Sequence, residues 1–263
     1  MSNGNRFVFI APMYNASQYV GQMLHSICGQ SYDNWKVLLI DDCSSQDEIE
    51  KENWIITGFK TLLQRLGQDP EKIQVVWNSE GRGKQWEVSN VLYGVSMCDD
   101  NDIISRIDAD DWLTDLDALK IINALYDHSG ADALWTAHRW GFTDRNISGP
   151  MPQDADPYSH PWVSSHFKTF KKVLLNGVPY QNFTNMNGEL VKRAGDQAIY
   201  LPVLRNSKRR GFIPRVMYHY TIDEQGGQVY QSDDAKFQKS EADYIRTRGY
   251  VSSGPTWEEV LGV

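Results

Sequence analysis

The chain has 263 residues, a formal net charge of −8 and 41% hydrophobic residues. This ordinary globular composition excludes a disordered or fibrous protein. The length suits one large α/β domain or two small ones. No apolar run reaches the roughly 20 residues that span a bilayer. The N-terminus also lacks the basic and apolar segments of a signal peptide.

The first half of the chain alternates between strand and helix patterns. In chain order we expect a strand at 6–10, a helix at 17–29, a strand at 35–40, a helix at 47–66, a strand at 73–77, a helix at 85–97 and a strand at 103–107. Such alternation predicts βαβ units and a parallel sheet. The candidate core residues of the second helix are Ile49, Trp54, Phe59, Leu62, Leu63 and Leu66.

The second half is less regular. We expect a helix at 116–128, a strand at 131–139, a long loop at 142–161, a helix at 166–175, a helical or mixed segment at 198–206 and a strand at 215–220. The polar tail from residue 223 onward is interpreted as a mobile lid or a peripheral helix.

Two features of composition bear on location and partners. The three cysteines, Cys28, Cys43 and Cys98, lack metal-ligand spacing, which predicts free thiols in a reducing compartment, the cytoplasm. Between His160 and Tyr220, ten basic and two acidic residues give +8, so the total of −8 leaves −16 elsewhere. This segment indicates either a face that meets an anion or a solvated surface with salt bridges.

Polar loops follow the first four expected strands, at residues 11–15, 41–47, 78–84 and 108–112. In a parallel sheet, ligands bind beyond the carboxyl ends of the strands. These loops bring together carboxylates, an arginine, a lysine and glycines. That combination fits a nucleoside diphosphate with a bound divalent cation.

The strongest local pattern is Asp108-Ala109-Asp110, directly after a strand. Two carboxylates at this spacing can reach one hard cation, Mg²⁺ or Mn²⁺, which prefers oxygen ligands and is often shared with substrate phosphates. The alternative is an acidic cap on a following helix, formed by Asp110, Asp111 or Thr114.

The loops after the second and third strands suit the other parts of a nucleotide. Asp42 can accept hydrogen bonds from a base or ribose, although Asp41-Asp42 can also form a turn with Ser44 and Ser45. Arg82 and Lys84 supply phosphate-binding charge. The absence of a Walker pattern and of Gly-x-Gly-x-x-Gly disfavours an ATPase and an NAD-binding domain.

In order and spacing, these residues resemble the inverting family 2 glycosyltransferases with the GT-A fold. The motifs that carry the resemblance over residues 6–135 are Pro12-Met13-Tyr14-Asn15, Ser26 to Gln30 with Trp35, Asp41-Asp42-Cys43-Ser44, Asn78 with Gly81-Arg82-Gly83, Asn90 with Gly94, and Asp108-Ala109-Asp110-Asp111. Cys43 stands where the family usually has glycine, a departure that affects the turn more than the ligand.

Three later segments extend the resemblance. Gly195-Asp196-Gln197 resembles the acidic motif that supplies the catalytic base, and residues 217–220 resemble the closing strand of the catalytic domain. Residues 166–171 resemble a stretch found in a bacterial and phage branch of the family.

The resemblance implies a Rossmann-like, mostly parallel central sheet flanked by helices, as one catalytic domain with a C-terminal extension on the acceptor side. Residues 1–112 would form the half that binds the nucleotide sugar, residues 113–222 the half that binds the acceptor, and residues 223–263 the tail. It implies Asp196 as the base and Asp108, Asp110 and His219 as ligands of Mn²⁺ or Mg²⁺. The implied donor-binding residues are Pro12, Tyr14, Asn15, Asp42, Arg82, Lys84, Asp108 and Ala109.

Alternatives remain for residues and for function. Asp196 can also be a surface acid near Lys192 and Arg193, and His219 a structural residue. The acceptor is expected to be a surface polysaccharide or lipid-linked glycan, or else hydroxymethylated DNA, as in phage base modification. A non-catalytic nucleotide-sugar-binding protein and a metal-dependent phosphohydrolase are the competing classes.

Overall fold

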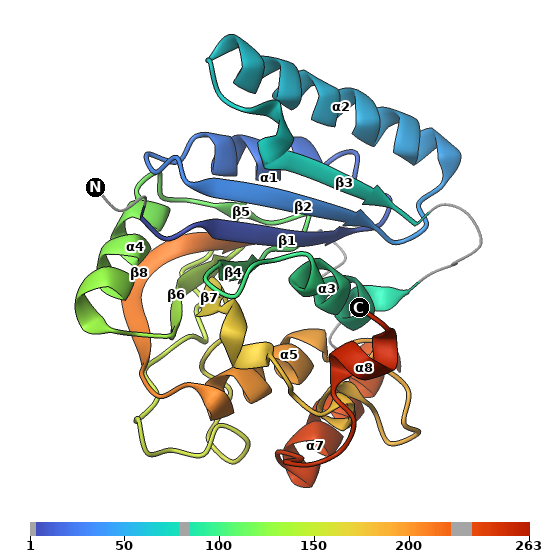
Figure 1. Ribbon diagram of the computed structural model, residues 1–263, viewed down its shortest axis with the longest axis vertical. Helices are drawn as coiled ribbons and strands as arrows, with labels where there is room; N and C mark the ends of the chain where they lie inside the picture. The colour runs from blue at the N-terminus through green and yellow to red at the C-terminus, as the bar shows by residue number, and fades with distance from the viewer. Residues whose placement is uncertain (1–3, 79–84, 222–232) are drawn as a thin grey trace.

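The computed structural model describes residues 4–78, 85–221 and 233–263 (Figure 1). The elements of the first half are β1 (Phe7–Met13), α1 (Val20–Cys28), β2 (Trp35–Asp41), α2 (Gln46–Arg65), η1 (Pro70–Lys72), β3 (Ile73–Trp77), α3 (Trp86–Ser96) and β4 (Ile103–Arg106). These elements follow the order of strands and helices that the sequence pattern predicts. The strand-helix alternation is therefore confirmed in this half.

The remaining elements are β5 (Trp112–Leu113), α4 (Ala118–Ser129), β6 (Ala133–Trp140), β7 (Lys168–Lys171), η2 (Lys172–Leu175), η3 (Tyr180–Phe183), α5 (Gly195–Asn206), β8 (Arg210–Tyr220), α7 (Asp233–Arg248) and α8 (Trp257–Leu261). Within the described ranges, eight strands form one sheet in the order β3-β2-β1-β4-β7-β6-β8-β5. Strands β1 to β4 pair in parallel, whereas β7 is antiparallel to both of its neighbours, β4 and β6.

Helices cover both faces of the sheet, because successive side chains of its central strands point to opposite sides. Phe7 and Phe9 of β1 join a core with α1, α2 and α4, while Val8 and Ile10 join a second core with α3 and α5. Helix α3 lies close to the sheet at Gly94, where an added Cβ would meet the Ile10 side chain at 2.7 Å. This close approach accounts for a glycine inside that helix.

Helix α2 lies at the top of the view in Figure 1, against the β3 edge of the sheet. Ile56 and Leu63 are buried, but Trp54 is 79% exposed and Leu66 is 65% exposed. The expectation that Trp54, Leu62 and Leu66 belong to the core was therefore wrong. Only part of the apolar face of this helix packs against the protein, and the rest is exposed to solvent.

The expected helix at residues 166–175 was also wrong. This segment forms strand β7 between β4 and β6, followed by the single turn of 3₁₀ helix η2. The spacing of Phe167, Phe170 and Leu174 fits a helix by sequence, and all three are buried. Pairing with two distant strands overrides that local pattern.

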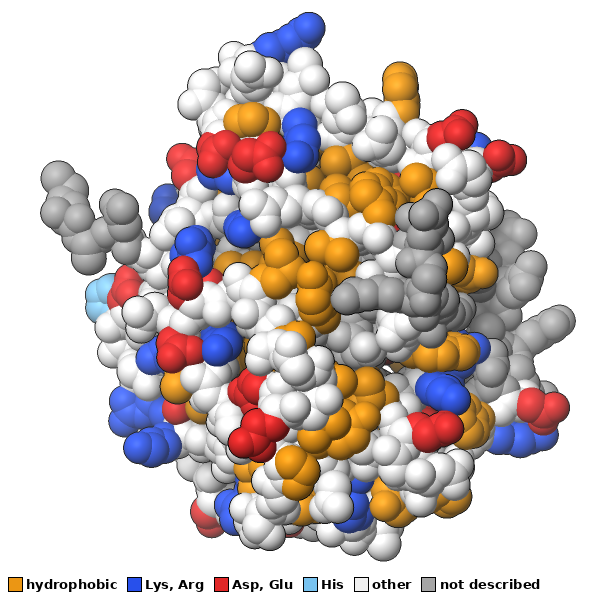
Figure 2. Space-filling view, turned by 45° about the vertical axis from the view of Figure 1, so that its right-hand side comes forward, with side chains coloured by type: hydrophobic (Ala, Val, Ile, Leu, Met, Phe, Trp, Pro, Cys, Tyr) orange, Lys and Arg blue, Asp and Glu red, His pale blue; other side chains and the backbone are white. Residues whose placement is uncertain are grey.

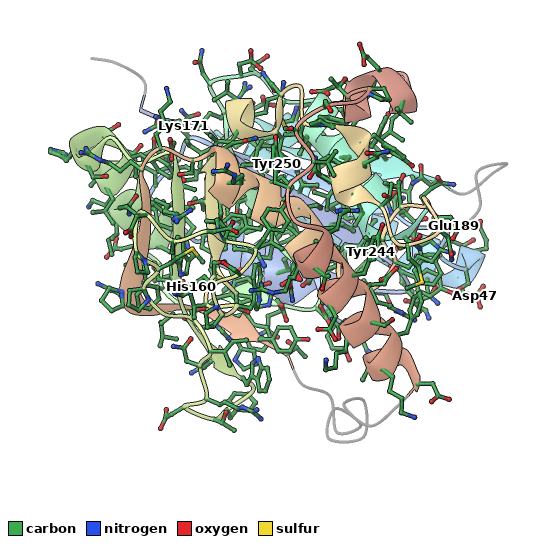
Figure 3. All side chains as sticks on the ribbon, turned by 90° about the horizontal axis from the view of Figure 1, so that it is seen from below. Asp47, His160, Lys171, Glu189, Tyr244 and Tyr250 are labelled. Atoms are coloured by element: carbon green, nitrogen blue, oxygen red, sulfur yellow. The ribbon has the colours of Figure 1, made fainter. Side chains whose placement is uncertain are left out.

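The C-terminal segment packs on the body of the protein. Helix α7 packs against α5, and Figure 3 shows it lying across that helix, with Tyr244 on α7 labelled. The Trp257 ring of α8 is fully buried, and its Nε1 donates to the carbonyl oxygen of Leu175 at 2.8 Å. A peripheral helix is thus present, while residues 222–232 lie outside the described ranges.

Across the described ranges, no helix combines the length and the apolar character that crossing a bilayer requires.

Candidate active site

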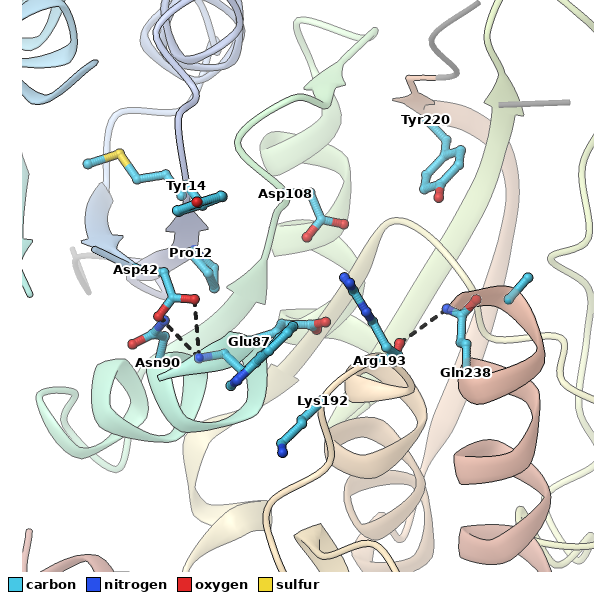
Figure 4. A pocket seen from close by; sticks show the side chains of 13 residues that line it. Pro12, Tyr14, Asp42, Glu87, Asn90, Asp108, Lys192, Arg193, Tyr220 and Gln238 are labelled. Atoms are coloured by element: carbon cyan, nitrogen blue, oxygen red, sulfur yellow. Dashed lines mark hydrogen bonds between the residues drawn. The ribbon is translucent and has the colours of Figure 1, made fainter. Parts of the chain in front are cut away.

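Two adjoining cavities, of about 420 Å³ and 490 Å³, open at the carboxyl ends of the parallel strands. They share part of their walls, including Pro12, Tyr14 and Asp108 (Figure 4). The first extends toward Asp42 and Asn90, and the second toward Asp110 and Asp196. The two form one continuous depression at the sheet edge where the sequence predicted ligand binding.

Most of the predicted site residues line this depression. They are Pro12, Tyr14, Asn15, Asp42, Asp108, Ala109, Asp110 and Asp196. Arg82 and Lys84 lie outside the described residues. His219 lines neither cavity, as far as the described residues define the walls.

The loop after β1 is fixed by the start of α2. The backbone N–H of Asn15 donates to Ser44 Oγ at 2.8 Å, and that of Ala16 donates to Glu52 Oε1 at 2.7 Å. Glu52 is fully buried, and this burial raises its pKa to about 7. Tyr14 is half exposed at the cavity mouth, and the backbone that follows it is fixed by these hydrogen bonds.

The turn after β2 adopts the geometry that the predicted Asx turn requires. The Asp41 carboxylate accepts hydrogen bonds from the backbone N–H groups of Cys43 and Ser44. Cys43 has a φ of 69°, the left-handed region that favours glycine. This explains physically why glycine is the usual residue at this position of the motif.

Asp42 is tied to the beginning of α3. Its Oδ1 accepts hydrogen bonds from the backbone N–H of Gln85 at 2.6 Å and from Asn90 Nδ2 at 2.9 Å, and Trp86 N–H also donates to the carboxylate. Figure 4 shows Asp42 and Asn90 together on the wall of the cavity. These hydrogen bonds orient the Asp42 carboxylate, which also lines the first cavity.

The acidic loop after β4 does not cap a helix. Helix α4 begins at Ala118, and the short strand β5 follows the loop instead. Asp111 is buried, and its carboxylate accepts hydrogen bonds from the Tyr218 hydroxyl at 2.7 Å and the Thr221 backbone N–H at 2.7 Å. The alternative of an acidic helix cap was therefore wrong, and Asp111 fixes the loop to the end of β8.

Burial raises the pKa of Asp111 well above its ordinary value, and the nearby Asp108 and Asp110 carboxylates raise it further. Concentrated negative charge of this kind favours a bound cation.

The donor set of this region fits a divalent metal ion. Asp108, Asp111 and His166 each place one possible ligand atom within 4.8 Å of the others, and Asp110 lines the same cavity. Both oxygens of Asp111 accept hydrogen bonds and Asp111 lines neither cavity wall, whereas Asp108 and Asp110 both line the second cavity. Burial holds the pKa of His166 well below its ordinary value, so its ring is neutral. Carboxylate oxygens suit Mg²⁺ and Mn²⁺.

Asp196 lies in the first turn of α5 and faces Lys168 of β7. Lys168 Nζ donates to Asp196 Oδ2 at 3.1 Å. Burial raises the pKa of Asp196, but the Lys168 and Arg106 cations outweigh burial and leave the pKa below its ordinary value. The group is therefore a carboxylate at neutral pH. The alternative of a surface acid beside Lys192 and Arg193 does not fit its place in the cavity wall.

Gly195 allows the start of α5 to lie close to Glu87 of α3, because a Cβ added at Gly195 would lie 2.5 Å from the Glu87 carboxyl carbon.

A buried charge network that the sequence pattern does not predict joins Asp108 of the acidic loop to Glu87 of α3. Arg106 pairs with Glu87 at 2.7 Å and with Asp108 at 2.6 Å, and its side chain is 8% exposed. The available signal was an arginine at the end of a buried strand, two residues before Asp108. Buried charges of this kind are rarely found without partners.

Helix α7 fixes the segment that precedes α5 through hydrogen bonds. The Glu241 carboxylate of α7 accepts hydrogen bonds from the backbone N–H groups of Lys192, Arg193 and Ala194 at 2.8–3.3 Å. Gln238 Nε2 donates to the Arg193 carbonyl, and Figure 4 shows the Arg193 side chain extending toward Asp108. Glu241 thus stabilises the first turn of the helix that carries Asp196.

A Glu241→Ala variant is expected to lower the free energy of unfolding by about 1–3 kcal/mol, because two partly buried backbone N–H donors and the buried one of Ala194 lose their acceptor. Urea denaturation measures this change. The matched control is Asp243→Ala on the same helix, which breaks only the exposed pair with Lys239 and is expected to change stability by less than about 1 kcal/mol. Equal effects of the two substitutions would contradict the anchoring role of Glu241.

His219 belongs to an aromatic cluster. Its ring stacks on Trp112 with centroids 3.7 Å apart, and its Nδ1 accepts a hydrogen bond from Arg139 Nε at 3.0 Å. Burial lowers the pKa of His219 to about 4, so the ring is neutral. The prediction of His219 as a metal ligand gains no support from this position.

Five of the ten basic residues between His160 and Tyr220 are buried or form ion pairs with acids. Lys168 and Arg210 are buried, and the Arg210 guanidinium donates to backbone carbonyls. Lys172, Lys192 and Arg215 form ion pairs with Asp100, Glu189 and Asp115. On the face seen in Figure 2, basic and acidic side chains lie interspersed. An anion-binding role for the remaining basic residues of this segment stays a prediction.

The sequence model described as "Glycosyl transferase family 2" matches residues 8–184. The chain is also 23% identical over 225 residues to the poly(ribitol-phosphate) beta-N-acetylglucosaminyltransferase TarS of Staphylococcus aureus, covering 84% of this chain and 36% of TarS. The chain spans between 19% and 36% of the length of the curated relatives it matches.

Two solved structures share the fold. TarS 1–349 of S. aureus with UDP-GlcNAc matches with a TM-score of 0.62 at 17% identity, covering 83% of this chain and 59% of that one. The mannosyltransferase PcManGT of Pyrobaculum calidifontis with GDP-Man and Mn²⁺ matches with a TM-score of 0.63 at 16% identity, covering 97% and 67%. These similarities establish a GT-A type fold, the predicted fold class.

Proposed function

Because the chain belongs to glycosyl transferase family 2, we propose that it transfers a sugar from a nucleoside-diphosphate sugar to a hydroxyl group of an acceptor glycan. One observation carries this proposal. The carboxylates of Asp108, Asp110 and Asp196 line one cavity together with the loop that follows β1. The structural neighbours were solved with UDP-GlcNAc and GDP-Man, which supports a donor of this class.

The nucleoside part of the donor lies at the Asp42 end of the cavity in this proposal. Asp42 accepts hydrogen bonds from the base or ribose, and the Tyr14 ring offers a stacking surface. Pro12 and Asn15 complete this wall. The loop is held rigidly by Ser44 and Glu52, so little ordering is needed when the donor binds.

Mn²⁺ or Mg²⁺ would be held by Asp108 and Asp110, with the neutral His166 ring beside them. When bound, the ion neutralises charge that develops on the departing diphosphate. Arg193, which extends into the cavity from the start of α5, supplies positive charge to the same group. The backbone of Ala109, between the two aspartates, faces the donor.

Asp196 acts as the general base. Its carboxylate removes the proton of the acceptor hydroxyl while that oxygen attacks the anomeric carbon. The bond between the anomeric carbon and the diphosphate oxygen breaks, and the nucleoside diphosphate leaves with the electron pair. A single displacement of this kind inverts the anomeric configuration. Lys168 orients the carboxylate and keeps it ionised.

We assign residues 1–112 to donor binding and residues 113–222 to acceptor binding, with the enzyme acting in the cytoplasm. The acceptor proposal rests on TarS, whose name specifies a poly(ribitol-phosphate) substrate. Hydroxymethylated DNA is the weaker alternative, because five of the ten basic residues that favoured it are buried or paired with acids. The intact acidic groups of the cavity disfavour a non-catalytic binding protein.

A panel of nucleotide sugars, tested by thermal unfolding with and without Mn²⁺, tests this function. Ligand that binds the native state raises the melting temperature by mass action. We expect one donor to stabilise the protein more strongly with Mn²⁺ and to release its nucleoside diphosphate when the acceptor is present. Hydrolysis of simple phosphate esters without sugar transfer would identify a phosphohydrolase instead and contradict the proposal.

A further inference from the structure

Aromatic rings and two arginines lie together at the ends of β5, β6 and β8. We call this the aromatic–arginine surface, and its members are Trp112, Arg139, Trp140, Phe142, Arg145 and Tyr220. It is continuous with the candidate active site in two places. Tyr220 lines both cavities, and Trp112 directly follows the acidic loop.

A well-fixed turn presents the outermost ring of this surface. Phe142 is 90% exposed. The backbone on either side of it is bonded in place, because Gly141 N–H donates to the Tyr220 carbonyl at 2.8 Å and Thr143 N–H donates to the Trp140 carbonyl at 3.0 Å. An apolar ring that is 90% exposed gains little from folding, whereas it offers a flat face to a ligand.

Each of the two arginines lies against an aromatic ring. The Arg145 guanidinium lies 4.1 Å from the Trp140 ring, and that of Arg139 lies 5.8 Å from the Phe142 ring. Within the described residues, neither forms an ion pair with a carboxylate. Arg139 uses Nε for its hydrogen bond to His219. A guanidinium has five N–H donors, so both retain donors for an oxyanion.

We infer that the aromatic–arginine surface binds the acceptor as an anionic glycan strand, with sugar or polyol carbons on Phe142 and the acidic groups on Arg139 and Arg145. This inference rests on the proposed function, since it places the strand beside the cavity that holds Asp196. Aromatic faces suit the C–H surfaces of such units, and guanidinium groups suit their oxyanions. Two arginines match a short anionic stretch, whereas duplex DNA is bound through many more phosphate contacts.

Direct binding of poly(ribitol phosphate) tests the inference, measured by affinity electrophoresis with UDP and Mn²⁺ present and again without them. We expect wild-type binding that weakens with salt. Phe142→Ala is expected to weaken it about tenfold, and Arg139→Gln with Arg145→Gln to weaken it at least tenfold and to reduce the salt dependence. Because Phe142 and Arg145 are exposed, unchanged melting temperatures check that the variants fold.

Matched controls come from helix α2, where Trp54 and Arg65 are exposed far along the chain from this surface. Trp54→Ala and Arg65→Gln are expected to leave polymer binding unchanged. Absence of wild-type binding, equal effects of test and control substitutions, or preferential binding of duplex DNA would overturn the inference. Failure of the proposed function has a different signature: no nucleotide sugar would stabilise the wild-type protein, whatever the polymer result.

Discussion

An Asp196→Asn variant is expected to bind the donor as the wild type does and to turn over 10²–10⁴ times more slowly, the usual range for loss of a general base. Asparagine keeps the size of the side chain and an oxygen for the hydrogen bond from Lys168. It cannot take up the proton of the acceptor hydroxyl. Initial rates at saturating donor and acceptor measure the loss, and thermal unfolding with donor measures binding.

The control is Asp154→Asn, which changes an exposed acid outside the cavity walls and is expected to leave turnover unchanged. A matching loss in both variants, or no loss in Asp196→Asn, would contradict the role of Asp196 as base.

The pH profile follows from the environment of Asp196. Burial raises the pKa of Asp196, but Lys168 and Arg106 lower it below the ordinary value. The Asp196 carboxyl group therefore stays ionised at about pH 4, where a free aspartate takes up its proton. We therefore expect no loss of turnover from protonation of Asp196 between neutral pH and about pH 4. Replacing Lys168 with glutamine removes the nearest cation, so the acidic limb is expected to move to higher pH.

An Asp110→Ala variant is expected to lose metal-dependent turnover, by a factor on the order of 10² or more, since the metal stabilises transition-state charge by several kcal/mol. The side chain lines the cavity beside Asp108. Rates across a Mn²⁺ titration measure the effect, and chelation with EDTA is expected to reduce the wild type to a comparable rate.

The Asp111→Asn variant tests whether Asp111 is a metal ligand or an acid with a structural role. Its carboxylate is taken by Tyr218 and Thr221, so the expected effect is on stability more than on the Mn²⁺ concentration required. If the Asp110→Ala variant responded to Mn²⁺ as the wild type does, Asp110 would not be a metal ligand.

The first half of the fold was predictable because local patterns and tertiary structure agree there. Buried parallel strands such as β2 read as continuous apolar runs, and each is followed by a polar loop. The carboxyl ends of such strands meet at one edge, so the sequence pattern alone predicts that Asp42 and Asp108 lie together. Their hydrogen-bond partners could not, because Asn90 comes from a different element.

The second half was harder because long-range pairing decides it. Strand β7 is fixed by β4 and β6, which local spacing does not reveal. The partnership of Lys168 with Asp196 joins residues from a strand and a helix, and the bonds from Glu241 cross from the tail. The prediction that Trp54 is buried failed because helical periodicity defines an apolar face but not what covers it.

The proposed mechanism requires one cavity to hold the donor between the acidic loop and Asp196. A crystal structure with Mn²⁺ and the nucleotide sugar that the panel selects tests it most directly. We expect an anomalous Mn²⁺ peak bound by Asp110 and the diphosphate, with the anomeric carbon on the side of Asp196. A Mn²⁺ peak or a nucleotide outside this cavity would contradict it.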